Sequence, residues 1–135
     1  MELADTSAWT NRHKDPAVDR DFEERILADE VATCPMVVME LLWTTQSQQE
    51  FEDLRRDLDV LAKVTNDQDS WDRAIDVWRE LVVQGRHRQV KIPDLLVAAS
   101  ADIAGLPVCH YDGDFDVIAT ITGQRVRAIA PIGSL

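Results

Sequence analysis

Short apolar runs alternate with longer stretches of helical periodicity along the whole chain. The run at residues 31–34 has the length of a strand, whereas Trp71, Ile75 and Trp78 follow the spacing of one helix face. Strands that alternate with helices pair in parallel, because each helix returns the chain to the same edge of the sheet. This order therefore predicts a layered α/β fold with crossover helices.

Apolar spacing and helix-capping residues together predict the individual elements. Asp15 and Pro16 are typical of a helix start, and Gly85 and Gly105 are typical of helix ends. The expected strands are residues 2–6, 31–34, 60–64, 108–111 and 126–129. The expected helices are one from 15–16 that ends before 31, and then 36–43, 48–58, 65 or 66 to 85, 94–104 and 115–121.

The length and composition are those of one ordinary domain. With 135 residues, 45% of them hydrophobic, we expect a single domain over residues 1–135. No apolar run approaches the ~20 residues that span a bilayer, so we expect a soluble, cytoplasmic protein without a membrane partner. Cys34 and Cys109 lack CxxC spacing and zinc-ligand neighbours, which favours reduced core thiols over a zinc site.

The formal net charge of −11 disfavours a protein that holds nucleic acid on a broad basic face. One basic cluster, Arg86–Lys91, lies just before Asp94. It is either a solvated loop or a local contact for phosphates. The acidic balance also suits a basic protein partner.

Four carboxylates lie inside an apolar run or next to one: Asp5, Glu40, Asp94 and Asp112. Strand ends of an open α/β sheet converge at one crevice, so acids far apart in sequence can meet there. Clustered acids repel one another unless a cation compensates them, and hard oxygen ligands suit Mg²⁺ or Mn²⁺. The constellation therefore predicts a divalent-metal site, for which hydrolysis of a phosphodiester is the natural chemistry.

Other acid-rich α/β folds fit the sequence less well. A phosphate-accepting receiver or a haloacid-type phosphatase needs a lysine late in the fold, and the three lysines are Lys14, Lys63 and Lys91. Both classes are therefore set aside. Two residues keep two interpretations each: Ser7 orients a ligand or caps a turn, and Asp114 is an outer ligand or a helix cap.

Four segments resemble the motifs of the PIN-domain ribonucleases, and the length and Asp-Phe-Asp ending are most similar to the VapC toxins of type II toxin-antitoxin pairs. The segments are Asp5–Trp9, Val37–Leu41, Pro93–Ala99 and His110–Phe115, and the resemblance covers essentially the whole chain. It implies a three-layer α/β/α PIN-like domain around a parallel sheet of about five strands.

For the chemistry, the resemblance implies a metal-dependent endoribonuclease. It implies that Mg²⁺ or Mn²⁺ is held by the acids Asp5, Glu40, Asp94 and Asp112, with Asp114 as a further candidate, and that cleavage leaves a 5′-phosphate and a 3′-hydroxyl. Where the family often carries Thr or Ser, this chain has His110, so that hydroxyl is missing beside the metal.

For partners, the resemblance implies a cognate VapB-type antitoxin whose basic tail enters the acidic cleft, a homodimer, and transfer or ribosomal RNA as substrate. Arg86, Arg88 and Lys91 are then expected to hold RNA phosphates beside the site. The apolar residues Trp43, Phe51 and Leu54 are candidates for the protein interfaces. The alternative function is a catalytically inactive PIN-like scaffold that binds RNA or protein, against which the presence of all four acids argues.

The expected strand order also separates the two cysteines. Cys34 and Cys109 are placed on opposite sides of the first strand, two strand spacings or ~9.6 Å apart. That separation is too long for a disulfide, so we expect two free thiols.

Overall fold

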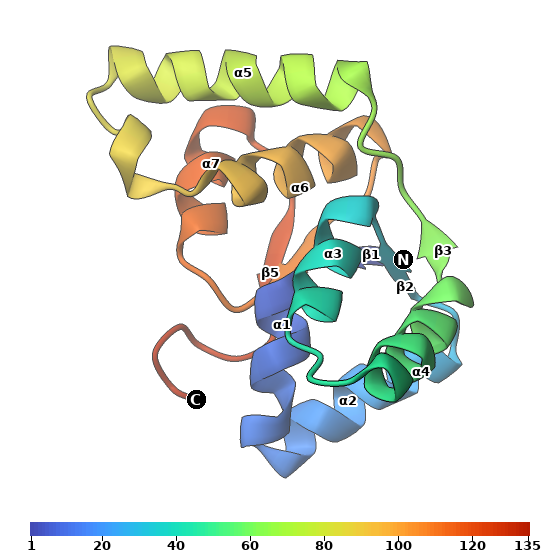
Figure 1. Ribbon diagram of the computed structural model, residues 1–135. Coiled ribbons are helices and arrows are strands. Elements are labelled where there is room, and N and C mark those ends of the chain that lie inside the picture. The colour runs from blue at the N-terminus through green and yellow to red at the C-terminus, as the bar shows by residue number, and fades with distance from the viewer.

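A five-stranded sheet forms the middle layer of the protein, in the order β3-β2-β1-β4-β5 (Figure 1). The computed structural model describes residues 1–135. All four neighbouring pairs of strands are parallel. The strands are β1 Glu2–Ala4, β2 Val31–Thr33, β3 Ala62–Lys63, β4 Val108–His110 and β5 Val126–Ala128. This sheet confirms the expected α/β class, the parallel pairing and the number of strands.

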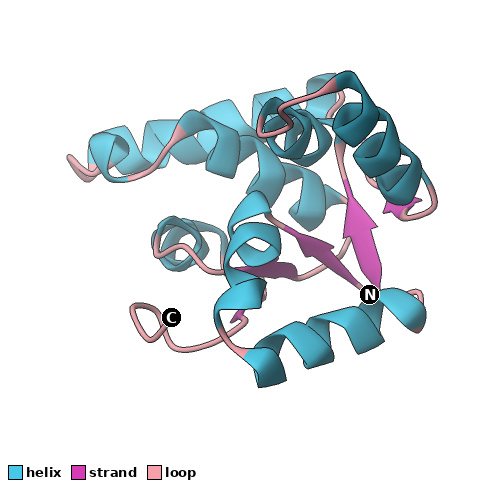
Figure 2. Ribbon diagram, turned by 60° about the horizontal axis from the view of Figure 1, so that its bottom comes forward, coloured by secondary structure: helices cyan, strands magenta, loops and turns pink.

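Helices cover both faces of the sheet, as Figure 2 shows from a second direction. They are α1 Thr6–Asn11, α2 Pro16–Leu27, α3 Pro35–Trp43, α4 Gln48–Asp59, α5 Gln68–Val83, α6 Ile92–Ile103 and α7 Asp114–Thr122, with short 3-10 turns at Arg12–Lys14 (η1) and His87–Gln89 (η2). Successive residues of β1 point to opposite faces of the sheet. Leu3 packs in the cluster with α3, α5, α6 and α7, and Ala4 packs with Phe22 of α2.

Most element boundaries differ from the sequence prediction by one or two residues, and three of these differences have a clear local cause or consequence. The first strand ends at Ala4 and not at residue 6, because Asp5 caps α1 by accepting a hydrogen bond from the Ser7 N–H. The strand expected at 60–64 is only Ala62–Lys63. The helix expected from 65 or 66 begins at Gln68, because the cap is Asp67, which accepts from the Ser70 N–H. The short helix α1 was not expected.

The helix α6 lies at the centre of the packing, and its residues from Asp94 to Ala101 are all buried. Asn66 links it to α3: its Oδ1 accepts from the Met36 N–H, and its Nδ2 donates to Ser100 Oγ, both at 2.8 Å. Ser100 Oγ in turn donates to the Leu96 carbonyl at 2.8 Å. This chain of hydrogen bonds fixes the start of α3 against α6, and thus the relative placement of Glu40 and Asp94.

Two smaller expectations concern the cysteines and the bilayer. Cys34 and Cys109 are both free and buried, and β2 and β4 flank β1, as the predicted strand order required. Every helix in the protein is too short or too polar to cross a bilayer.

Candidate metal centre

The carboxyl ends of β1 and β4 meet at Asp5 and Tyr111, and Ser7 connects them. Asp5 is buried, and its Oδ2 accepts hydrogen bonds from the Ser7 N–H at 2.9 Å and from Ser7 Oγ at 2.6 Å. Ser7 Oγ also accepts from the Tyr111 N–H at 2.9 Å, across 104 residues of sequence. Ser7 therefore orients Asp5, while Asp5 caps α1. The other oxygen, Asp5 Oδ1, is buried and has no hydrogen-bond partner.

Glu40 enters the site from α3, where it is half-buried. Thr6 Oγ1 donates a hydrogen bond to Glu40 Oε1 at 2.9 Å, so the first residue of α1 orients this carboxylate. Burial raises the pKa of Asp5, its hydrogen bonds with Ser7 partly offset this, and the charge of Glu40 adds to the rise. Sequence analysis did not single out Thr6, although its place directly after Asp5 was a usable signal.

Asp94, Asp112 and Asp114 form the tightest group of acids. Each contributes one carboxylate oxygen to a set in which all three atoms lie within 4.8 Å of one another. Asp94 is buried in the first turn of α6, and Asp112 Oδ1 accepts from the Asp114 N–H at 2.9 Å. Asp114 begins α7, yet its carboxylate lies in the cluster, so of its two interpretations the ligand position fits the geometry.

The ammonium of Lys91 lies among these three acids. Its Nζ is 2.8 Å from Asp114 Oδ2, 2.9 Å from Asp112 Oδ2 and 3.3 Å from Asp94 Oδ2. Burial alone would lower the pKa of Lys91, but hydrogen bonds to Asp114 and Asp112 outweigh it and raise the pKa above its ordinary value. In this arrangement Lys91 neutralises the acids, a position that sequence analysis did not assign to it.

The acids do not all ionise easily together. Burial, the hydrogen bond with Asp114 and the charge of Asp5 raise the pKa of Asp94 to about 8, against the opposing effect of Lys91. Burial would also raise the pKa of Asp114, but its hydrogen bonds with Asp94 and Lys91 lower it. The charges of Asp5 and Asp112 thus add to the pKa of Asp94, and the charge of Lys91 reduces this repulsion among the carboxylates.

The donor set fits a hard divalent cation. Asp5 Oδ1 is a buried oxygen that accepts no hydrogen bond, and the neighbour of the buried Asp94 Oδ2 is the Lys91 ammonium at 3.3 Å. Asp5 interacts electrostatically with both Glu40 and Asp94. It therefore connects Glu40 on α3 with the acids at the starts of α6 and α7. Carboxylate oxygens within 4.8 Å of one another are the hard ligands that Mg²⁺ or Mn²⁺ prefers, and the Lys91 ammonium occupies the position where such a cation would compete with it.

His110 packs behind the turn that carries Asp112 and supports it. Its side chain is fully buried, and its Nδ1 accepts from the Asp112 N–H at 3.1 Å. The ring packs against Phe115, with 5.1 Å between the ring centroids, and burial lowers the pKa of the imidazole. A neutral imidazole that accepts at Nδ1 holds the turn that carries Asp112.

The arginines of the basic cluster lie in the segment between α5 and α6, which also carries Lys91. Trp78 Nε1 donates to the His87 carbonyl at 3.1 Å and anchors the turn η2 on α5. Arg86 is half-buried and donates to Gln89, Gln84 and Thr120, whereas Arg88 is exposed. Neither guanidinium is paired with a carboxylate, so both charges remain available to a ligand.

Comparison with known proteins bears on the whole chain. The sequence pattern of the PIN domain matches residues 3–121. The chain is 40% identical to Ribonuclease VapC18 of Mycobacterium tuberculosis over 97% of this chain and 96% of that protein. It is 37% identical to Ribonuclease VapC21 of the same organism over 98% and 96% of the two chains. The fold is similar to that of a chain in the DNA-bound VapBC structure from Salmonella typhimurium, with a TM-score of 0.75, 18% identity and coverage of 96% and 100%.

Proposed function

Because this chain belongs to the PIN-domain family and its relatives are VapC ribonucleases, we propose that it is the endoribonuclease toxin of a VapBC-type toxin-antitoxin pair. The reaction is hydrolysis of RNA phosphodiester bonds, and residues 1–135 act as one PIN domain. Without a membrane-spanning helix, the domain is suited to act on RNA in the cytoplasm.

The observation that carries the proposal is the cluster of Asp94, Asp112 and Asp114, together with the buried Asp5, whose Oδ1 accepts no hydrogen bond. Asp5, Glu40, Asp94 and Asp112, with Asp114 beside them, would hold Mg²⁺ or Mn²⁺. A divalent ion there would supply an activated water and neutralise charge on the scissile phosphate. The expected products carry a 5′-phosphate and a 3′-hydroxyl.

The residues around the acids position them for this reaction. The Ser7 hydroxyl holds Asp5 Oδ2, so that Oδ1 is the oxygen left for a ligand. The Thr6 hydroxyl directs Glu40 in the same way. Because these contacts exist before any ligand enters, little reorganisation is needed when the phosphate arrives, and such preorganisation lowers the barrier.

We assign the contacts with RNA phosphates to Arg86 and Arg88, whose charges are unpaired. A few local contacts suffice to hold a backbone in register on an otherwise acidic protein. Lys91, the third residue of that predicted set, lies on the acids and would reach a phosphate only after it leaves them. The substrate class is transfer or ribosomal RNA.

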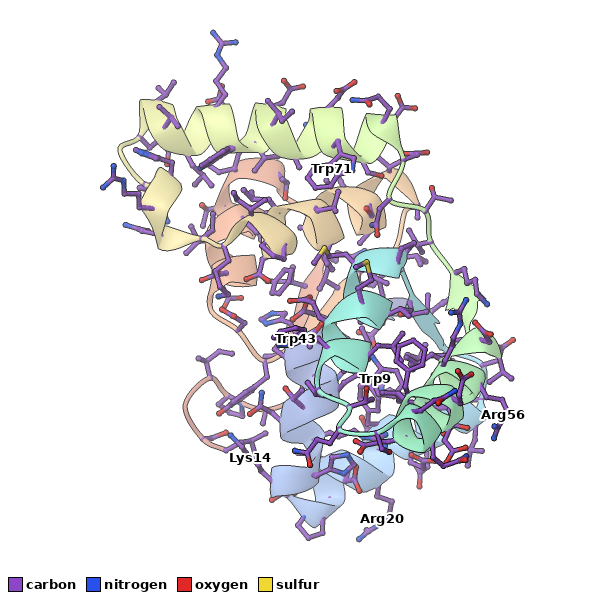
Figure 3. The ribbon with its side chains drawn as sticks, viewed as in Figure 1. Trp9, Lys14, Arg20, Trp43, Arg56 and Trp71 are labelled. Carbon is purple, nitrogen blue, oxygen red and sulfur yellow. The ribbon has the colours of Figure 1, made fainter.

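A groove beside α1, α2 and α4 suits the VapB-type antitoxin. Its volume is about 700 Å³, and its apolar lining includes Trp9, Ile26 and Leu54. Arg12 and Arg56 lie at its polar edge, and Figure 3 shows Arg56 on α4. An apolar segment of the antitoxin would fill the groove, while its basic tail reaches the acidic site. A homodimer is also part of this proposal.

The test is cleavage of total bacterial RNA by the purified protein and by Asp94→Asn, with Mg²⁺ or Mn²⁺ and with EDTA. We expect cleavage that depends on the metal and is lost in Asp94→Asn. The matched control is Asp76→Asn, which changes an exposed acid of α5 and should cut like the wild type. No cleavage in any condition, together with no Mn²⁺ binding by calorimetry, would favour the inactive scaffold.

A further inference from the structure

One face of α3 runs from Glu40 to an exposed tryptophan. Met36, Met39, Glu40 and Trp43 are spaced three and four residues apart, so their side chains share this face. Trp43 is 87% exposed and Met39 is 69% exposed, although large apolar side chains of this kind are usually buried. Together with Thr6 they line a shallow pocket of about 330 Å³, which we call the Trp43 pocket.

We propose that the Trp43 pocket binds one unpaired nucleobase of the RNA, stacked on the indole of Trp43 beside the scissile phosphate. The proposal rests on the nuclease function proposed above. It adds a position for a base beside the acidic site, for which only metal and phosphate contacts have been proposed so far.

The pocket is continuous with the acidic site. Glu40 lines the pocket and interacts electrostatically with Asp5, and Thr6 lines the pocket while it orients Glu40. Trp43 follows Glu40 by three residues, which is ~4.5 Å along the helix axis. Neighbouring nucleotides of a stacked strand are ~3.4 Å apart, so a strand with a phosphate at the acids brings the adjacent base to Trp43. Figure 3 shows Trp43 at the end of α3 on the side toward α1, apart from Trp9.

The chemistry of the pocket suits a base better than a phosphate. Neither Lys nor Arg lines it, so it offers nothing to neutralise an anion. The indole and the thioethers of Met36 and Met39 provide flat, polarisable surface instead. With a net charge of −11 and few phosphate contacts, this protein needs binding energy that does not come from ion pairs, and stacking on an aromatic ring provides it.

Charge also argues against a second copy as the occupant. A second copy seated on the pocket would bury the Glu40 carboxylate, and no Lys or Arg of the pocket is there to pair with it, so its burial opposes association through this face. The polar side chains of the pocket, Thr6 and Glu40, are already bonded to each other at 2.9 Å. The pocket therefore does not discriminate bases by hydrogen bonds to their edges, and it accepts all four. Purines should bind more tightly because their larger rings overlap the indole more.

The experiment combines changes in the protein with changes in the RNA. The wild-type cleavage site is mapped, and a short synthetic single-stranded RNA that spans it is made with an abasic residue at each flanking nucleotide in turn. The variants are Trp43→Ala, Trp43→Phe and the control Trp71→Ala, whose side chain on α5 is 41% exposed. The mass of each variant in solution is measured by light scattering.

For Trp43→Ala we expect KM to rise by about 5- to 100-fold, the range given by the stacking of one base, while kcat changes little. Trp71→Ala should remain near the wild type, and Trp43→Phe, which keeps a smaller aromatic ring, should raise KM less than Trp43→Ala does. In the wild type, an abasic residue at one flank should raise KM by the same factor, and in Trp43→Ala it should cost nothing further.

Several results would overturn the stacking site. One is an equal rise of KM in Trp43→Ala and Trp71→Ala. Another is that the effects of Trp43→Ala and of the abasic residue on KM are additive. A third is a KM change in Trp43→Ala that accompanies loss of a dimer, which would assign the pocket to a second copy. Cleavage by the wild type with no effect of Trp43→Ala rejects this site alone. No cleavage by any protein rejects the nuclease function, and this inference with it.

Discussion

Lys91 donates two hydrogen bonds to a single oxygen of Asp114, from its backbone N–H at 3.0 Å and from its ammonium at 2.8 Å. The pair joins the loop before α6 to the start of α7, across 23 residues of sequence. The backbone bond survives any change of the side chain, so the ammonium can be removed without releasing the loop. This property makes Lys91 a direct probe of how the acids are neutralised.

Lys91→Met should bind Mn²⁺ about fivefold more tightly than the wild type, because a divalent ion no longer displaces an ammonium from Asp112 and Asp114. A partly exposed ion pair is worth about 1 kcal/mol, which sets this factor. Titration calorimetry measures the affinity. Lys63→Met, which removes an exposed ammonium on β3, is the control. Unchanged or weaker binding by Lys91→Met would show that the ammonium does not compete with the metal.

Ser7→Ala removes the hydroxyl that connects Asp5 to Tyr111. It leaves the Tyr111 N–H without its partner, so we expect a loss of about 1–3 kcal/mol in the free energy of unfolding. Cleavage should also slow, because Asp5 Oδ2 loses its shortest hydrogen bond and the carboxylate is free to turn. Urea denaturation and initial rates measure the two effects. The control Ser134→Ala, at an exposed position, should change neither stability nor cleavage rate. A Ser7→Ala protein as stable and active as the wild type would refute the role of the Ser7 hydroxyl.

Replacement of Arg86 and Arg88 by Glu should weaken RNA cleavage through KM and leave Mn²⁺ affinity unchanged. The loss of two phosphate contacts should also reduce the slope of log affinity against log salt by roughly 1.4 for single-stranded RNA. The control is the pair Arg20→Glu and Arg56→Glu, on α2 and α4 (Figure 3). Unaltered cleavage by the Arg86 and Arg88 double variant would rule out this basic segment as the phosphate contact.

Cys109 should make the protein less stable in alkali. Burial raises the pKa of its thiol to about 12, against a small opposing effect of Arg127, whereas the unfolded thiol titrates near 9. The folded state thus favours the protonated thiol: this stabilisation is complete below pH 9 and is lost as the pH rises toward 12.

Between pH 8 and pH 10 the wild type should lose about 1.4 kcal/mol more than Cys109→Ala, because one pKa unit corresponds to that energy. Urea denaturation of both proteins at the two pH values gives the difference. The cavity left by the alanine shifts both of its values equally and cancels. Parallel pH dependence of the two proteins would mean that the thiolate is not excluded from the folded state.

Local patterns in the sequence were sufficient for most of the fold. The proline at the start of α2 and the glycines after α5 and α6 act within one helical turn, so their effect is readable from neighbours alone. Boundaries failed where capping chemistry ended an element early, as at Asp5, whose carboxylate caps α1 although the strand was expected to reach Thr6. The strand β3 is too short to show the alternation of apolar and polar residues that would have predicted its ends.

The sequence by itself determined the order of the elements and the parallel sheet, and it predicted the acids of the site, because periodicity, capping and motif order are properties of adjacent residues. Only the tertiary structure decided which atoms meet: that Thr6 orients Glu40 across 34 residues, that Ser7 reaches Tyr111, and that the ammonium of Lys91 contacts the acids. Such contacts depend on how helices pack over the sheet, and packing sums many weak interactions among residues that are distant in the chain.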